Sequence, residues 1–133
     1  MDSLKIEPTE DSPSVLFDIS ANRFVISGES RPENASKFYA PVINWLVEFE
    51  GVLYWRKNEM EEQPLLVFVF LMDYFNSTSA KSIMDILLIL KKFIAEGYPV
   101  KIEWHYDKQD EDMFETGKEF ATTVGLKFDL IED

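Results

Sequence analysis

The chain contains no cysteine and only one histidine among its 133 residues. Without cysteine, neither a disulfide framework nor a thiolate metal site can hold the fold together. A zinc site or a Ser-His-Asp triad would have to rely on His105 alone for its imidazole. There is also no P-loop and no G-x-G-x-x-G motif. The sequence therefore gives no sign of a metal or a cofactor, and we expect His105 to be a packed or hydrogen-bonded side chain at a strand end.

Basic residues and long apolar runs are also scarce. Lysine and arginine number 13 against 25 acidic residues, which gives a net charge of −12. Such a charge argues against nucleic acid and against anionic membranes as partners. No apolar run approaches the roughly 20 residues of a transmembrane helix, and the N-terminus lacks the apolar core of a signal peptide. We therefore expect a cytoplasmic protein without membrane insertion.

The predicted fold is organised around the stretch from Leu65 to Leu90. Leu65 to Met72 is an unbroken apolar run rich in valine and phenylalanine, which predicts a strand at the centre of a sheet, buried on both faces. Helical spacing then predicts a core-facing helix over residues 80–96, with Gly97 as the residue after its C-cap. The apolar residues at this spacing are Ile83, Ile86, Leu87, Leu90 and Ile94.

The segment before this stretch predicts a tail, a hairpin and a helix. Residues 1–13 are polar and contain two prolines, so we expect a loose tail. Alternation over residues 15–19 and 24–26 predicts a short hairpin that ends at Gly28. Ser30 to Glu33 has the form of a capping box, with Asn34 as the competing N-cap. The helix that follows should kink or restart at Pro41, and we expect it to continue past Gly51. Its apolar face consists of Phe38, Val42, Trp45, Leu46 and Phe49.

The segments after the central strand and helix complete an α/β domain. Residues 57–63 predict a charged loop, and residues 99–106 predict a strand. A helix is expected next, up to Gly125, and residues 126–131 predict a last strand. The predicted order is β-β-α-β-α-β-α-β. Residues 14–133 are thus expected to form a single domain with a mixed β-sheet and helices packed against it.

Three consecutive hydroxyls, Ser77, Thr78 and Ser79, follow Asn76 where the central strand turns into a helix. One of them would suffice as an N-cap, which contributes about 1 kcal/mol. A helix start also binds anions, because its free N–H groups and the positive end of its dipole converge there. The residues alone leave open whether this turn is a cap or a regulated phosphorylation site.

Two other hypotheses come from the residues. The first is a small acid–base enzyme that uses His105 with Asp107, and the second is a constitutive structural or interaction subunit. The acids that follow Asp107 lack the glycine of an EF-hand loop, so we interpret them as the start of a helix.

Three segments, in the same order, are similar to one known family. The first is Gly28 to Asn34 (GESRPEN) with Phe38-Tyr39 and residues 41–46. The second is Tyr74 to Lys81 (YFNSTSAK) with Met84-Asp85. The third is Trp104 to Asp107 with residues 110–113, Glu115 and Gly117. On these motifs the chain resembles the SiaC family of bacterial regulatory phosphoproteins from about Ser14 onward.

The resemblance implies a fold similar to STAS domains, the anti-sigma-factor antagonists, and a non-enzymatic partner switch. In this family a dedicated kinase phosphorylates a hydroxyl just after the motif asparagine, and a PPM-type phosphatase removes the phosphate. The unphosphorylated form of the protein that names the family activates a diguanylate cyclase, which raises cyclic di-GMP and promotes biofilm formation.

Position by position, the resemblance makes Ser77 the phosphoacceptor. Thr78 is an alternative because the family residue is often threonine, and Ser79 is a further alternative in the same run of hydroxyls. The expected partner surface lies on the exposed parts of the helix over 80–96 and on the 30–39 segment. Its residues are Glu33, Asn34, Tyr74, Asn76, Ser79 and Lys81.

Overall fold

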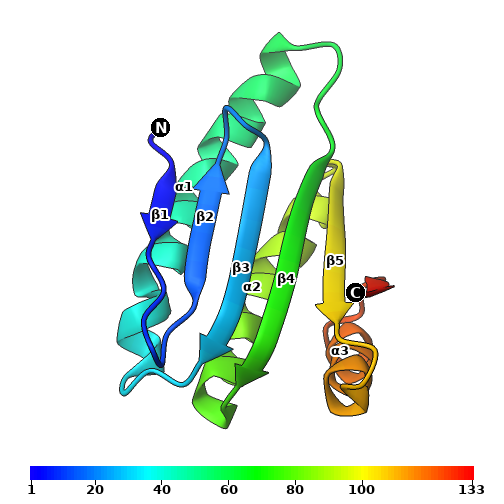
Figure 1. Ribbon diagram of the computed structural model, residues 1–133. Helices are drawn as coiled ribbons and strands as arrows, with labels where there is room; N and C mark the ends of the chain where they lie inside the picture. Colours follow the sequence, from blue (N-terminus) through cyan, green and yellow to red (C-terminus); the bar gives the residue numbers. More distant parts are fainter.

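The computed structural model covers residues 1–133 and contains one six-stranded mixed sheet with three helices (Figure 1). The strands lie in sequence order, and the first three are antiparallel while β3 to β6 are parallel. The strands are β1 (Leu4–Ile6), β2 (Ser14–Asp18), β3 (Arg23–Ser30), β4 (Leu66–Phe75), β5 (Val100–Tyr106) and β6 (Asp129–Glu132). The helices are α1 (Ala35–Glu59), α2 (Ser77–Ala95) and α3 (Glu111–Val124). The predicted α/β domain with a mixed sheet is confirmed.

The N-terminal segment differs from the prediction. Residues 4–6 form strand β1, which pairs with β2 at the edge of the sheet, so the order begins with three strands instead of two. The Trp45 indole also donates to the carbonyl oxygen of Asp2 (2.9 Å). The expectation of a loose tail is therefore wrong at these residues, because pairing with the hairpin gives the short segment partners that its own sequence does not reveal.

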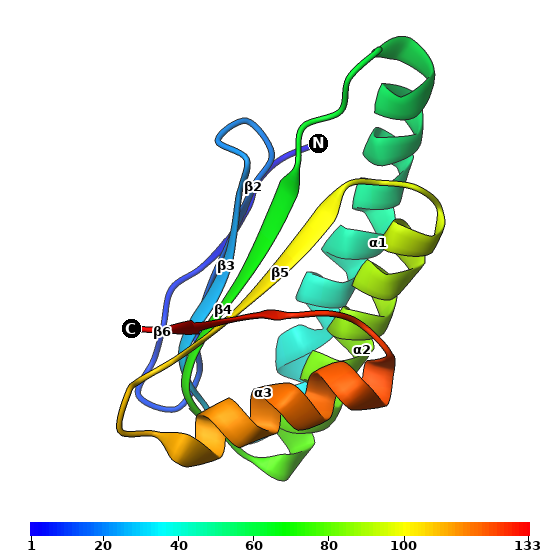
Figure 2. The same ribbon diagram turned by 90° about the vertical axis from the view of Figure 1, so that its right-hand side faces the viewer.

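All three helices lie on one face of the sheet (Figure 2). The connections β3-α1-β4, β4-α2-β5 and β5-α3-β6 each step to the next strand in the same direction. Because such crossovers are right-handed, steps in one direction put every helix on the same side. The central strand β4 is accordingly buried at Leu66, Phe68, Phe70 and Met72 but only half-buried at the alternate positions. The prediction that it is buried on both faces is wrong for the face without helices.

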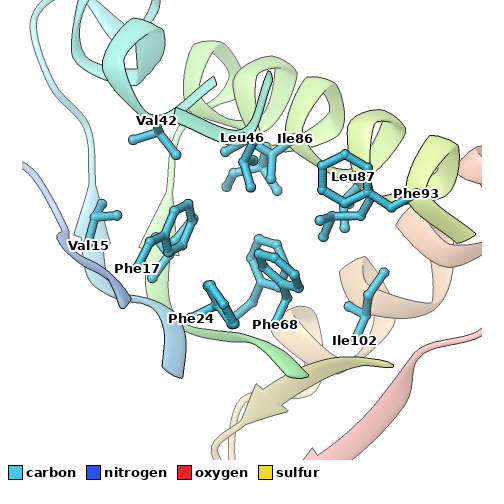
Figure 3. Packing of buried hydrophobic residues seen from close by; sticks show 14 of the residues in the cluster. Val15, Phe17, Phe24, Val42, Leu46, Phe68, Ile86, Leu87, Phe93 and Ile102 are labelled. Carbon is cyan, nitrogen blue, oxygen red and sulfur yellow. The ribbon is translucent and has the colours of Figure 1, made fainter. Parts of the chain in front are cut away.

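The core lies between the sheet and the helix layer and consists of 26 buried hydrophobic residues. Figure 3 shows side chains of the sheet pointing towards those of α1 and α2, and Phe24 stacks on Phe68 with 4.6 Å between ring centroids. The buried stripe of α1 has spacings of 4, 3, 4, 3 and 4 residues and consists of Ala35, Tyr39, Val42, Leu46, Phe49 and Leu53. No helix is both long enough and apolar enough to cross a bilayer.

Helix boundaries correct several predictions. Asn34, the competing candidate, is the N-cap of α1, and its side chain accepts from the Lys37 amide. The capping box is wrong, because Ser30 ends strand β3 instead. Gly28 does not end that strand; it has a positive φ of 104° at a register shift, and pairing continues beyond it. Helix α1 continues past Gly51 as expected, and its extension to Glu59 replaces the first part of the predicted charged loop.

Candidate functional site

The hydroxyl run forms the first turn of α2, directly after the central strand. Asn76 is the N-cap, and its side-chain oxygen accepts from the Ser79 amide (2.9 Å) and from the Thr78 hydroxyl (3.0 Å). Ser77 and Thr78 are exposed, whereas Ser79 is fully buried. The helix thus begins three residues earlier than predicted, and the asparagine supplies the capping oxygen. None of the three hydroxyls is needed as the N-cap.

The start of α1 lies beside the start of α2. A hollow between them is lined by Glu33, Asn34, Ala35, Ser36, Lys37 and Phe38 from the α1 side and by Thr78 from α2. Strands β3 and β4 are parallel, so the helices that follow them both begin at the same end of the sheet. The positive ends of two helix dipoles therefore point towards the same surface. The first amides of each helix have no partner within the helix, and Lys37 and Lys81 are exposed nearby.

The sequence motifs expected to form a partner surface converge only in part. Glu33 and Asn34 share the hollow with Thr78, while Tyr74 is half exposed at the end of β4. Lys81 is exposed one turn after Ser77. Ser79 does not belong to this surface, because its side chain points into the core with no exposed area.

Beneath the surface, three buried hydroxyls join β3, α1 and α2. Ser30 donates to Ser79 (2.8 Å), and the Tyr39 hydroxyl lies 2.6 Å from Ser30. Because the single hydrogen of Ser30 goes to Ser79, Tyr39 is the donor to Ser30. Burial raises the pKa of Tyr39, against the opposing effect of its hydrogen bonds with the two serines, so the phenol keeps its proton. The Asn76 amide also donates to the Ser30 carbonyl (3.0 Å).

This hydroxyl cluster was missed by reasoning from the sequence. Tyr39 falls on the buried 4-3-4 stripe of α1, which is a signal that the sequence does contain. Ser30 gives no such signal, because its role depends on partners in two other elements, of which Ser79 lies 49 residues away along the chain. The cluster fixes the first turn of α2 against α1, and an unpaired member would carry a penalty of about 1–3 kcal/mol.

His105 is engaged at both ring nitrogens. Its Nδ1 lies 2.8 Å from Asp133 Oδ1, and its Nε2 lies 3.0 Å from Glu103 Oε1. Asp107 turns back to accept from the Gln109 amide (2.9 Å). His105 is thus hydrogen-bonded, as expected for a structural histidine. With both nitrogens held by carboxylates of the chain itself, the arrangement offers no free base for acid–base catalysis.

Stability should depend on pH through His105. Burial by itself lowers the pKa of His105, but the hydrogen bonds with Asp133 and Glu103 outweigh it, so the pKa is raised in the folded state. The protonated form therefore stabilises the fold fully below the ordinary value of about 6.5, and the benefit is lost as the pH rises through the raised pKa. We expect the denaturation midpoint to fall across this window.

Urea denaturation from pH 5.5 to 8.5 would measure this dependence. His105→Gln keeps the size and removes the titration, so its midpoint should change much less over that range. An equal slope in both proteins would contradict the assignment to His105.

A single α/β domain of this topology, with all its helices on one face of a mixed sheet, is consistent with the STAS-like class of regulatory domains. A profile of the SiaC family regulatory phosphoprotein matches residues 6–133. The chain therefore belongs to the SiaC family of regulatory phosphoproteins.

The relatives support this membership over their whole length. The chain is 32% identical over 130 residues to an uncharacterized protein of Pseudomonas aeruginosa (strain UCBPP-PA14). The aligned region covers 96% of this chain and 94% of the relative. It is similar in structure to apo-SiaC from Pseudomonas aeruginosa (29% identity, TM-score 0.81, coverage 100% and 99%). It is also similar to SiaC in complex with the diguanylate cyclase SiaD, of which that SiaC is the activator (30% identity, TM-score 0.82, coverage 98% and 99%).

The comparisons confirm the expected family and the expected role of a regulator rather than an enzyme. The alternative of an acid–base enzyme built on His105 and Asp107 is therefore wrong, in agreement with the hydrogen bonds that occupy that histidine.

Proposed function

We propose that this protein is a cytoplasmic partner switch controlled by reversible phosphorylation of Ser77. A dedicated kinase adds the phosphate and a PPM-type phosphatase removes it. The unmodified protein binds an effector, which we propose to be a diguanylate cyclase, and thereby acts on cyclic di-GMP and biofilm formation. The observation that supports this proposal most directly is an exposed hydroxyl in the first turn of α2, beside the start of α1.

Ser77 is favoured as the phosphoacceptor over Thr78 and Ser79, because the hydroxyls of those two residues are already hydrogen-bonded. Thr78 donates to the Asn76 side chain, and Ser79 is buried within the hydroxyl cluster. A kinase would have to open the first turn of α2 to reach Ser79. Ser77 is exposed, and no side-chain hydrogen bond occupies its hydroxyl. The chain can therefore present Ser77 without any change in fold.

A phosphate on Ser77 suits the local electrostatics of the folded chain. It would carry about −1.5 to −2 charges near the positive ends of two helices, whose effect on a nearby anion is about 0.3–2 kcal/mol in its favour. Lys81 lies one turn further along α2 and adds a cation on the same side. Phosphorylation should therefore leave the fold intact and act on the partner interface.

A complex formed by a relative supports the proposed effector. SiaC of Pseudomonas aeruginosa forms a complex with the cyclase SiaD, and this chain shares its fold over nearly the whole length. We place the docking surface on the exposed side of α2 and on residues 33–38, which line a hollow with Thr78, the residue after Ser77. The residues proposed to contribute are Glu33, Asn34, Tyr74, Asn76 and Lys81.

Mass spectrometry of the protein purified from its native host tests the modification. We expect a fraction with one added phosphate, mapped to Ser77, that disappears in Ser77→Ala. Thr78→Val is the matched control and should keep the phosphate. A phosphate that survives Ser77→Ala, or protein that never carries one, would contradict the proposal and favour Thr78 or a constitutive subunit.

A further inference from the structure

The first turn of α2 has no apolar anchor of its own. Ser77 and Thr78 are exposed, and Ala80 is only half-buried. Ser79 is therefore the one side chain of this turn that is fully buried. The rest of the helix packs into the core through apolar side chains from Ile83 onward. The position of the first turn thus depends largely on the contacts of a single serine.

The contacts of Ser79 are polar and reach two other elements. Ser30, at the end of β3, donates to Ser79 (2.8 Å), and the hydroxyl of Tyr39 in α1 lies 2.6 Å from that of Ser30. All three members of this hydroxyl cluster are fully buried. Buried hydrogen bonds specify one arrangement, whereas apolar contacts allow several. The cluster therefore sets where the first turn of α2 lies relative to α1.

The hydroxyl cluster adjoins the hollow between the two helix starts. Phe38 and Thr78 line this hollow from its two sides. Each of them is followed in the sequence by a member of the cluster, Tyr39 or Ser79. A displacement of the first turn of α2 would therefore alter the hollow and the surroundings of its exposed hydroxyls.

The closed turn also distinguishes the two exposed hydroxyls from each other. Thr78 donates its hydroxyl to the side-chain oxygen of Asn76 (3.0 Å), and the same oxygen accepts from the Ser79 amide (2.9 Å). Both bonds require the turn to be formed. No side-chain hydrogen bond holds Ser77 in this state, so its hydroxyl is free, whereas opening of the turn would release Thr78 as well.

We infer, on the basis of the proposed function, that Ser30, Tyr39 and Ser79 are positioning residues that restrict phosphorylation to Ser77. The cluster holds the first turn of α2 closed. In the closed turn Thr78 is engaged, and Ser77 is the hydroxyl that a kinase meets. The three residues act through the backbone of the turn and do not touch the phosphate.

A variant that lacks all three hydroxyls tests this role. It combines Ser30→Ala, Tyr39→Phe and Ser79→Ala in the full chain. No buried hydroxyl is then left without a partner, so the thermal midpoint should stay close to that of the wild type. The first turn nevertheless loses the directional contacts that fix its position.

Hydrogen exchange measures the opening of the turn independently of any kinase. The Asn76 amide donates to the Ser30 carbonyl, and the Ala80 amide donates to the Asn76 carbonyl. Both amides should exchange faster in the triple variant by about tenfold or more, as expected for the loss of two buried hydrogen bonds. The Leu90 amide, in the second half of α2, should keep its rate.

Mass spectrometry of the same proteins from the native host shows which hydroxyl is modified. In the wild type we expect the phosphate on Ser77. In the triple variant the share of phosphate on Thr78 should rise by about tenfold or more, in step with the opening of the turn. Leu90→Val is the control, because it lowers stability by removing buried volume far from the cluster. Its phosphate should stay on Ser77.

The outcomes separate this inference from the proposed function. Unchanged exchange of the Asn76 and Ala80 amides in the triple variant would overturn the inference, and so would faster exchange with the phosphate still confined to Ser77. An equal rise on Thr78 in Leu90→Val would overturn it too, since general loss of stability would then suffice. In each case a wild-type phosphate on Ser77 leaves the proposed function standing. A wild type without phosphate on Ser77 would contradict both.

Discussion

Phosphorylated Ser77 is expected to weaken binding of the effector by roughly 10²- to 4 × 10³-fold while the fold remains intact. A partner that covers the first turn of α2 must bury the phosphate, and a buried charge without its counterion is unfavourable by about 3–5 kcal/mol. At about 1.4 kcal/mol per factor of ten in affinity, this penalty gives the expected loss. The change in free energy of unfolding should be small, because the helix dipoles accommodate the anion.

The measurement is a titration of a SiaD-type diguanylate cyclase with phosphorylated and unmodified protein. Ser77→Ala should bind as the unmodified protein does, and Ser77→Asp should be weakened less than the phosphorylated form, because aspartate carries less charge. The circular dichroism and the thermal midpoints of all four proteins serve as the control for folding.

An outcome in which the phosphorylated protein binds as tightly as Ser77→Ala would contradict the electrostatic block. Tighter binding would reverse its direction and point to cations on the effector that meet the phosphate. Such cations are a requirement for the kinase and phosphatase, which must recognise this same site.

Gly117→Val is expected to lower the free energy of unfolding by about 3 kcal/mol. Helix α3 lies close to β5 at this glycine, where a Cβ would be 2.5 Å from the Trp104 ring and 3.0 Å from Leu130. Trp104 is fully buried and donates its indole N–H to the Met113 carbonyl (3.1 Å). The ring therefore cannot move aside without losing that hydrogen bond and its packing. Chemical denaturation at constant pH measures the loss.

Gly51 provides a matched control within the same chain. Both glycines lie inside helices, so helix propensity favours their replacement equally, by about 0.5–1 kcal/mol for alanine. Gly51→Ala should therefore stabilise the protein, and Gly51→Val should change it by less than about 0.5 kcal/mol. If Gly117→Val were as stable as Gly51→Val, the close approach of α3 to Trp104 would not hold in solution.

The elements that the sequence predicted well are those with a strong local pattern. Alternation predicted the hairpin, and helical spacing predicted the continuation of α1 past Gly51. The position of Gly97 after α2 follows from the preference for glycine where φ is positive. The errors occur where partners are distant. Strand β1 needs β2 beside it, and Ser30 changes from an expected helix cap to the end of a strand because β4 pairs with it.

For the site, the sequence by itself placed a run of hydroxyls where a central strand meets a helix, and its motifs indicated the family. Only the tertiary structure decided that Asn76 caps the helix, that Ser79 is buried and that Ser77 and Thr78 are exposed. The physical reason is that the helical period fixes which residues share a face. Burial of that face depends instead on what packs against it. For the first turn of α2 this is Ser30 and Tyr39, contributed by two other elements of the chain.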